Sequence, residues 1–504
     1  MNKLVAQRAG RSALVAVSAL TVVASATAQG VFVRGFEGTS QLDNCVLNQC
    51  FRPPDTMGAI GTTQFLESSN GSITIYNKGT GALAIPRVSM TTFWASAGLP
   101  GGANGDQRVL FDHYSNRWIM NGFGPTANLI NIAVSATADA TGLWKSTQIA
   151  VLPSGTADYP TLSMDDKAVY IGTNNFTPGF SGTSLLSIPK SSLFGAVAST
   201  AGMTTFTTPL AGPDNGFAIQ VALNWQGNPS NTASVIADSR DLNSQVFYKV
   251  NGVNAAGATQ TASINIAGSG YASAPLGRQP DGTRTVDTLS PRITANAVQV
   301  NGKIYSTATV AADVGTAAAV RWTVVDATTG VQLSTGKIQD AAFDYYEGSI
   351  AVNEFGEAVI AYNRSGGQVA DLNGDGKADG SISFMARAFD VSGNLLVQDG
   401  AELLLRVSDV TDYHCTTVPP AAPCRERWGD YAAVTIDPNN HRSFYAIGEY
   451  AAPSAIIPGF TTTPRSIWHT YVAEITQVPE PSQYALMLFG LGAVGWAVRR
   501  CQAA

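Results

Sequence analysis

One short stretch of the sequence has the residue types and spacing of a metal-binding loop. Residues 371–379 read DLNGDGKAD. Oxygen donors occupy positions one, three, five and nine, position six is a glycine that permits a tight turn, and position seven offers a backbone carbonyl: Asp371, Asn373, Asp375, Asp379, Gly376 and Lys377. Calcium is a hard cation that takes several oxygen ligands from a loop of this kind. The spacing therefore predicts a structural Ca²⁺ site, with a metal-free Asp/Asn/Gly turn as the alternative.

Position twelve of this loop is Ile382, so the bidentate glutamate of an EF-hand is absent. The loop instead resembles the shorter Asp-x-Asp-x-Asp-Gly-x-x-Asp type found in hairpins of FG-GAP and integrin-like propellers. Val369–Ala370 before the loop and Ile382–Phe384 after it have the composition of strands, which favours a hairpin.

The sequence motifs of common enzymes are absent. There is no H-E-x-x-H zinc motif, no G-x-S-x-G nucleophile elbow, no P-loop and no dinucleotide fingerprint. Four histidines lie in turn-like or strand-end contexts, and we expect them to be surface or structural residues rather than bases: His113, His414, His441 and His469. No catalytic residue is predicted.

Seven segments share a rough pattern that indicates a repeated β-structure. Each has a polar entry, a short apolar strand, a turn and a second strand rich in β-branched or aromatic residues. The segments are 54–76, 105–120, 158–172, 290–306, 346–361, 428–446 and a fainter copy at 219–247. Most begin roughly 50 to 75 residues after the one before, the length of a four-stranded propeller blade with insertions. Blades packed around an axis would cover each other's faces.

Residues 50–475 resemble a β-propeller of the sialidase-like or BNR-like superfamily. The resemblance lies in this repeat, in Pro53-Pro54-Asp55-Thr56 near its start and in Trp428-Gly429-Asp430-Tyr431 near its end. An Asp-box of the Ser-x-Asp-x-Gly-x-Thr-Trp type is missing, so the resemblance does not imply sialidase activity. We predict an all-β propeller of seven four-stranded blades, with six blades or tandem β-sandwiches as alternatives.

A propeller gathers the starts of its innermost strands around one mouth of a central channel. These starts carry the candidate ligand site: Asp55, Asp106, Arg108, Asp158, Tyr159, Arg292, Glu347, Trp428 and Asp430. A carboxylate pair such as Asp158 and Glu347 could serve glycoside hydrolysis, and Trp428 could stack on a sugar ring. The alternative is a ring of hydrogen bonds and ion pairs between blades, because buried backbone groups at strand starts need partners.

The end of the chain has the features of a transport signal. Pro479-Glu480-Pro481 is followed by an apolar run from Tyr484 to Val498 and by Arg499-Arg500. The run has about 15 apolar residues, fewer than the ~20 of an ordinary spanning helix, and the arginines fit a cytoplasmic end. This order resembles the PEP-CTERM sorting tail of bacterial surface and exopolysaccharide-associated proteins. The resemblance implies processing by an exosortase, a membrane-embedded cysteine protease.

The N-terminus has the features of an export signal. An apolar run from Ser12 to Val23 follows basic residues, and Ala26-Thr27-Ala28 is a small-x-small cleavage site, so we expect the mature chain to begin at Gln29. The expected organisation is a signal peptide at 1–28, an N-terminal extension at 29–50, the propeller at 51–475 and the sorting tail at 478–504.

Cysteine spacing and charge agree with an exported protein. Cys45 lies close to Cys50, and Cys415 lies close to Cys424, which suggests two local disulfides, with free thiols as the alternative. Charged residues make up 13% of the chain and the net charge is −6. Because no basic patch is present, we expect no nucleic-acid partner.

These features predict a protein exported from a Gram-negative-type bacterium. Its tail would anchor it transiently in the inner membrane before it reaches the cell surface or the medium. The first functional hypothesis is a non-enzymatic propeller that binds or structures extracellular polysaccharide. The second is a secreted glycosidase or lyase on the same scaffold, a hypothesis that depends on analogy between folds.

Overall fold

The structure, a computed structural model, describes residues 29–102, 105–283, 285–413, 425–456 and 465–478. The signal peptide, the Cys415–Cys424 pair and the sorting tail after Val478 lie outside these ranges. Within the described residues, no helix combines the length and the hydropathy that crossing a bilayer requires.

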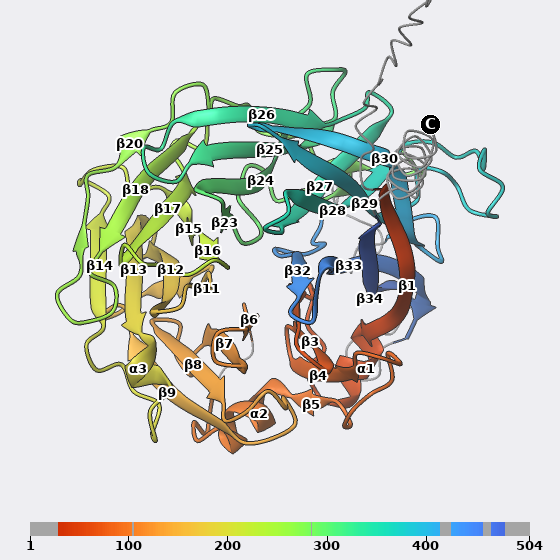
Figure 1. Ribbon diagram of the computed structural model, residues 1–504. Coiled ribbons are helices and arrows are strands. Elements are labelled where there is room, and N and C mark those ends of the chain that lie inside the picture. Colours follow the sequence, from red (N-terminus) through yellow and green to blue (C-terminus); the bar gives the residue numbers. More distant parts are fainter. Residues whose placement is uncertain (1–28, 103–104, 284, 414–424, 457–464, 479–504) are drawn as a thin grey trace, which may run out of the picture. The chain divides into compact units, whose positions relative to one another are not determined.

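Seven sheets stand around a common axis and form the blades of a β-propeller (Figure 1). In each blade the chain runs back and forth from an inner strand near the axis to an outer strand at the rim. The prediction of an all-β propeller with seven blades of mostly four strands is confirmed.

The first three blades follow one another in the chain. Blade 1 contains β2 (Met57–Ile60), β3 (Gln64–Ser69), β4 (Ser72–Asn77) and β5 (Val88–Ser89). Blade 2 contains β6 (Arg108–Asp112), β7 (Arg117–Phe123), β8 (Leu129–Ser135) and β9 (Trp144–Ala150). In blade 3 two short strands share the inner position, and the strands are β10 (Thr156–Asp158), β11 (Ser163–Met164), β12 (Ala168–Phe176), β13 (Phe180–Pro189) and β14 (Thr204–Pro209).

One short strand links the next two blades. Blade 4 contains β15 (Phe217–Val221), β17 (Thr232–Asp238), β18 (Gln245–Asn251), β19 (Thr259–Gln260) and β20 (Ile264–Asn265). Blade 5 contains β16 (Leu223–Asn224), β23 (Val298–Val300), β24 (Lys303–Ala311), β25 (Ala318–Asp326) and β26 (Gln332–Ile338). Strand β16 follows blade 4 in the chain but pairs in parallel with β23 of blade 5, so it ties the two blades together.

The last two blades bring the chain back to its start. Blade 6 contains β27 (Phe343–Val352), β28 (Glu357–Gly366), β29 (Ser383–Ser392) and β30 (Leu395–Val407). Blade 7 contains β32 (Ala433–Asp437), β33 (Asn440–Ala455), β34 (Arg465–Val478) and, as its outer strand, β1 (Gln29–Ser40).

One small sheet and three short helices of the described residues lie outside the blades. A three-stranded sheet contains β21 (Gly277–Arg278), β22 (Thr285–Val286) and β31 (Arg425–Glu426). The helices are α1 (Gln41–Val46), α2 (Met90–Ser96) and α3 (Lys190–Leu193).

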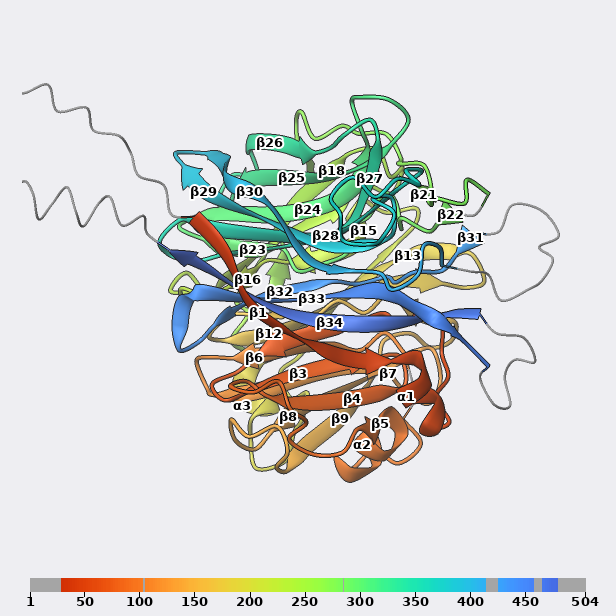
Figure 2. The same cartoon turned by 90° about the vertical axis from the view of Figure 1, so that its right-hand side faces the viewer.

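Strand β1 corrects the expected domain boundary, because residues 29–40 are part of the propeller rather than an extension. The strand pairs antiparallel with β34, from Gln29 opposite Val478 to Ser40 opposite His469 (Figure 2). The first described strand therefore closes the ring against the last. An outer strand donated by the other end of the chain leaves no gap between the first and last blades.

Buried Glu67 strengthens this closure from blade 1. Its carboxylate accepts hydrogen bonds from Tyr76 Oη at 2.7 Å, Thr39 Oγ1 at 3.0 Å and Thr470 Oγ1 at 2.6 Å. Thr39 belongs to β1 and Thr470 to β34, so one side chain holds blades 1 and 7 together. Strand β3 corrects the expected repeat, in which residues 72–76 form the second strand of the first segment. Polar residues on a strand buried on both faces hide the apolar alternation of an ordinary strand.

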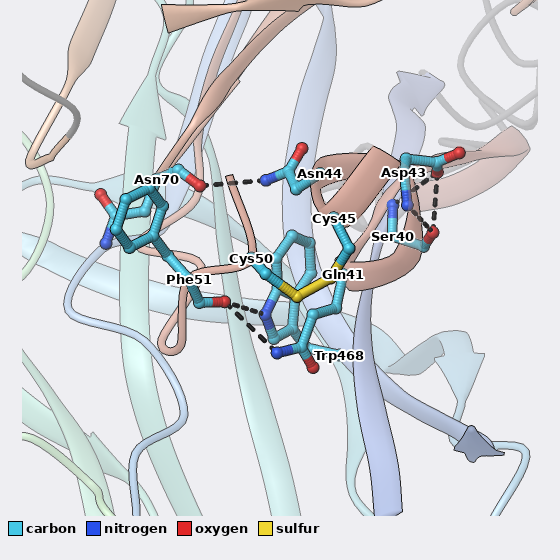
Figure 3. The surroundings of a disulfide bond; sticks show 9 residues. All are labelled: Ser40, Gln41, Asp43, Asn44, Cys45, Cys50, Phe51, Asn70 and Trp468. Atoms are coloured by element: carbon cyan, nitrogen blue, oxygen red, sulfur yellow. Dashed lines mark hydrogen bonds between the residues drawn. A yellow bond between two sulfur atoms is a disulfide. The ribbon is translucent and has the colours of Figure 1, made fainter. Parts of the chain in front are cut away.

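The Cys45–Cys50 disulfide lies just after β1 (Figure 3). It closes the turn that ends helix α1, whose start is capped by reciprocal hydrogen bonds between Ser40 and Asp43. The carbonyl of Phe51 after the bridge accepts a hydrogen bond from Trp468 Nε1 of β34 at 3.1 Å. The bridge thus fixes the segment that leads from blade 7 into blade 1.

The central channel is apolar and narrow. Inner strands from blades 1, 2, 5, 6 and 7 line it with side chains such as Met57, Val109, Val298, Ala351 and Val434. The free volume inside is about 20 Å³, close to that of one water molecule. The two mouths of the channel, rather than its bore, are therefore the places where a ligand can enter.

Candidate functional site

The starts of the inner strands form one mouth of the channel, here named the strand-start mouth. At this mouth six blades place a non-glycine residue in the left-handed region, with φ between 46° and 55°: Asp55, Asp106, Tyr159, Ala218, Leu289 and Glu347. Such a conformation costs about 1–3 kcal/mol for each residue. Its recurrence in successive blades indicates that each residue gains a compensating contact.

At three of these positions the compensating contact is a hydrogen bond to the preceding blade. The backbone N–H of Asp106 donates to Asn70 Oδ1 at 3.0 Å, that of Ala218 to Asn174 Oδ1 at 2.9 Å and that of Glu347 to Thr309 Oγ1 at 3.1 Å. Equivalent residues act at other blades, where Asn121 Nδ2 donates to the carbonyl of Thr161 and Asp238 Oδ2 accepts from the N–H of Ile293. Each of these side chains lies near the end of the second strand of its blade or directly after it. We name these side chains the inter-blade clasp.

The carboxylates of the candidate site take part in the same network. Asp55 Oδ1 accepts the backbone N–H of Asp430 at 2.9 Å, which joins blade 1 to blade 7. Asp106 Oδ2 accepts the hydroxyl of Tyr431 at 2.8 Å. Asp430 pairs with Arg427, with an Nη2–Oδ1 distance of 2.6 Å. Asp55 and Asp106 therefore bind groups that lead into blade 7, whereas Asp430 pairs with a side chain of its own loop.

The cations of the mouth lie against aromatic rings. Arg108 is fully buried and its guanidinium carbon lies 3.9 Å from the centre of the Tyr431 ring and 5.3 Å from that of Tyr159. Arg292 lies 5.4 Å from the centre of the same Tyr159 ring and 5.3 Å from that of Phe217. Cation–π contacts of this kind gain strength when the charge is shielded from water.

Burial makes the carboxyl groups weak acids. It raises the pKa of Asp55, Glu347 and Glu449 well above the usual range, and neighbouring carboxylates raise it further. Burial, Asp158 and Asp430 together raise the pKa of Asp106 to about 7. Burial also raises the pKa of Asp158, with Asp430 adding to the effect. A group that is protonated in the folded state serves as a hydrogen-bonding partner rather than as a fixed charge.

Glu449 belongs to this cluster, although the sequence did not single it out. It is 1% exposed on β33, and an added Cβ at Gly429 would lie 2.8 Å from its Oε1. Any larger residue in place of this glycine would displace the Glu449 carboxyl group. A sequence signal existed, since Glu449 is the single acidic residue in the apolar run Phe444–Ala452.

Trp428 does not face a ligand. Its indole is fully buried, its Nε1 donates to Asn363 Oδ1 at 3.2 Å, and its ring meets the Tyr413 ring edge to face at 4.7 Å. The structure therefore brings eight of the nine candidate residues to the strand-start mouth and places Trp428 behind them as core. Of the carboxylates that could form a hydrolytic pair, Glu347 is 1% exposed and Asp158 is half-buried.

The predicted calcium loop lies in an exposed connection between β28 and β29. Asp371 Oδ1 accepts the N–H of Gly374 at 2.7 Å, and Asp371 Oδ2 accepts that of Gly376 at 2.8 Å. Asp375 Oδ1 accepts the N–H of Lys377, and Asp379 Oδ2 accepts that of Leu372. Among the described residues, no three His, Cys, Asp or Glu side chains are gathered closely enough to hold a metal. The loop has the turns that its composition predicts, and calcium binding stays a prediction.

The opposite mouth of the channel, here named the turn mouth, contains a cavity of about 230 Å³. Trp225, in the loop after β16, forms one wall. Glu354, in the β27–β28 turn, and His441, at the start of β33, form another. The floor is apolar and consists of Val300, Val352 and Ile436. Trp225 also lines the channel, so its indole separates the cavity from the bore. None of the site residues predicted from the sequence lines this cavity.

The indole of Trp225 is held from behind by His113. The two rings are stacked, with centres 4.1 Å apart and planes 8° apart. Burial lowers the pKa of His113 to about 4, so this imidazole is neutral near pH 7. His441 Nδ1 lies 2.6 Å from Glu354 Oε1. An aromatic wall facing a polar wall over an apolar floor is an arrangement that can bind a small molecule.

The fold and the two mouths define a closed seven-bladed propeller. Comparison with known proteins indicates how the chain is sorted. The PEP-CTERM protein-sorting motif matches residues 477–500. The chain therefore carries the sorting tail that the sequence predicted, which implies export, membrane-associated sorting and processing by an exosortase. No curated protein matches the sequence.

Several solved structures are similar in fold. The Dos1 propeller is 9% identical, with 90% of this chain and 96% of that chain covered and a TM-score of 0.37. The N-terminal domain of Nup159 is 8% identical, with 90% and 96% covered and a TM-score of 0.40. An endo-arabinanase of family GH43 from Bacillus licheniformis is 10% identical, with 58% and 96% covered and a TM-score of 0.30.

Proposed function

We propose that the processed chain is a non-enzymatic binding or structural propeller of a Gram-negative-type bacterium. After release from its membrane-bound tail it would work at the cell surface or in the extracellular matrix, in association with exopolysaccharide. The sorting tail supports the compartment. The disulfide between Cys45 and Cys50 supports an oxidising destination.

The absence of catalysis is inferred from one observation, the inter-blade role of the acidic residues. A glycosidase needs two carboxyl groups that flank the scissile bond in an open site. At the strand-start mouth, Asp55 binds the backbone of Asp430, Asp106 binds the hydroxyl of Tyr431, and Glu347 is buried. Asp55 and Asp106 hold blades together and Glu347 is enclosed, so these groups are not free to protonate a leaving group or to attack a sugar.

A glycan array tests the proposal directly. Residues 29–478 contain all seven blades and the strand that closes the ring, so this fragment matches the exported part of the chain. We expect it to retain one or more bacterial polysaccharides on the array. Each polysaccharide that binds is then incubated with the protein and analysed for released sugars. Binding without release supports the proposal, and no binding to any glycan refutes it.

A pair of variants separates the enzymatic alternative. If sugars are released, Asp158→Asn and Glu347→Gln are assayed for loss of that release at unchanged binding. Such a loss would establish a glycosidase or lyase and overturn the non-enzymatic proposal. Asp241→Asn, an exposed position outside the mouth, is the matched control.

A further inference from the structure

We propose that the turn-mouth cavity binds one neutral pyranose residue of a polysaccharide, stacked on Trp225 and hydrogen-bonded to Glu354 and His441. The inference deepens the proposed function, because it gives the expected exopolysaccharide a place on the propeller. It differs from the sequence-derived candidate site, which lies at the other end of the channel.

The size of the cavity limits the ligand to a single ring. Its volume is about 230 Å³, below the ~300–1,000 Å³ of pockets that enclose drug-sized molecules. The channel behind Trp225 has only about 20 Å³ of free volume, so a chain cannot thread through the propeller. A polymer would therefore present one residue or one chain end to this mouth.

The platform is fixed before any ligand arrives. Tyr114 Oη donates to the carbonyl of Asn224 at 2.8 Å and accepts the N–H of Gly227 at 2.7 Å. It therefore binds the backbone on both sides of Trp225. Asn224 Nδ2 also donates to the carbonyl of Gly227 at 2.8 Å, and His113 covers the rear face of the indole. A ligand that packs on a fixed ring does not have to order it, which favours binding.

The polar wall is also held in place. Asn353 Nδ2 donates to the carbonyl of His441 at 2.9 Å, and Asn301 Nδ2 donates to the carbonyl of Glu354 at 3.2 Å. Glu354 Oε1 pairs with His441 Nδ1, while Glu354 Oε2 and His441 Nε2 have no hydrogen-bond partner among the residues that the structure describes. A carboxylate oxygen is a strong acceptor for hydroxyl groups, and the remaining imidazole nitrogen can donate or accept one more hydrogen bond.

This combination favours a sugar over other small ligands. A pyranose has an apolar face of C–H groups and an edge of hydroxyls, which match an indole on one side and a carboxylate on the other. A quaternary ammonium ion is typically enclosed by several aromatic faces. Among the described residues that line this cavity, Trp225 is the only Phe, Tyr or Trp, and the imidazole of His441 meets it edge to face with ring centres 6.4 Å apart. An anionic sugar would meet the carboxylate of Glu354, and like charges repel.

Nuclear magnetic resonance of the indole groups tests the site apart from the function. The protein has eight tryptophans. The indole Nε1–H signal of Trp225 is assigned as the one that is present in the wild-type spectrum and absent from that of Trp225→Phe. The probes are the methyl glycosides of glucose, galactose and mannose, with choline chloride as the cationic comparison. We expect at least one glycoside to shift the Trp225 signal and to leave the fully buried Trp94, Trp118 and Trp468 unchanged.

The same variants are then tested on the glycan array. Trp225→Ala should lower the affinity for a bound polysaccharide about tenfold or more, Trp225→Phe should lose less, and Glu354→Ala should weaken binding without changing the melting temperature. Asp241→Asn, at an exposed position outside the turn-mouth cavity, is the control and should bind as the wild type does.

The outcomes separate the site from the function. Polysaccharide binding that Trp225→Ala leaves intact, with no shift of the indole signal, overturns the site and leaves the proposed function standing. A shift caused by choline and by no glycoside overturns the ligand class. Failure of every polysaccharide and every glycoside refutes both the site and the proposed function.

Discussion

The acidic cluster at the strand-start mouth makes the stability of the propeller depend on pH. Asp106 provides the clearest case, because burial, Asp158 and Asp430 raise its pKa from 3.8 to about 7, although Tyr431 and Arg108 act in the opposite direction. The unfolded chain ionises this carboxyl near its ordinary pKa. Ionisation therefore costs free energy in the folded state only.

The sign of the effect follows from the raised pKa. The stabilisation is fully present below about pH 4, where both states are protonated, and is lost as the pH rises through about 7. The rise in pKa from 3.8 to about 7 corresponds to about 4 kcal/mol. Asp106 keeps some contact with solvent, so we expect about 2–4 kcal/mol. For a domain of about 450 residues, this lowers the melting temperature by roughly 2–4 °C.

Asp106→Asn removes the ionisation and keeps the fold. Asparagine tolerates the left-handed conformation of this residue and can still accept the hydroxyl of Tyr431. Calorimetry of residues 29–478 between pH 5 and pH 8.5, at constant ionic strength, should show a falling melting temperature for the wild type and a flatter curve for the variant. The exposed control Asp241→Asn should follow the wild type. A variant that melts lower than the wild type at pH 8 would refute the reasoning, because Arg108 would then make the ionised carboxylate favourable.

Three further predictions concern stability. Replacing Cys45 and Cys50 by serine should lower the free energy of unfolding by about 2 kcal/mol, because the bridge spans a separation of 5 residues; an unchanged urea midpoint would contradict this. Glu67→Ala should cost about 3–5 kcal/mol by leaving three buried hydroxyl donors without their acceptor, whereas Glu67→Gln should cost less, and equal losses in denaturant titrations would argue against the hydrogen bonds. Calcium should raise the melting temperature in calorimetry, and Asp375→Ala should abolish that rise; a wild-type curve that EDTA leaves unchanged would remove the calcium site.

Much of the architecture was readable in the sequence because blades are local structures. The turns at 112–116, 164–167, 301–302, 353–356 and 437–440 each join an inner strand to its neighbour, as their Asp, Asn and Gly content predicts. Strands β3 and β1 were not predicted, each for its own reason. Glu67 makes β3 look polar, and β1 finds its partner β34 at the other end of the chain.

The role of the candidate site residues was harder to predict from the sequence, because it depends on their burial and on partners far away in the chain. Asp55 and Asp430 are separated by 375 residues and share a hydrogen bond. Their types and spacing are compatible with catalysis, binding or blade closure. Trp225 carried no local signal either, because a tryptophan in a Gly/Asn/Pro loop is as compatible with a core position as with a ligand wall.

The sequence by itself determined the repeating hairpins, the number of blades, the sorting tail and the close pair Cys45 and Cys50, because each is encoded by neighbouring residues. The tertiary structure alone decided which end of the channel is closed by hydrogen bonds and which end holds a cavity. Closing the ring brings polar residues from all blades to the same axis, and the free energy of each buried charge depends on the neighbours that it meets there.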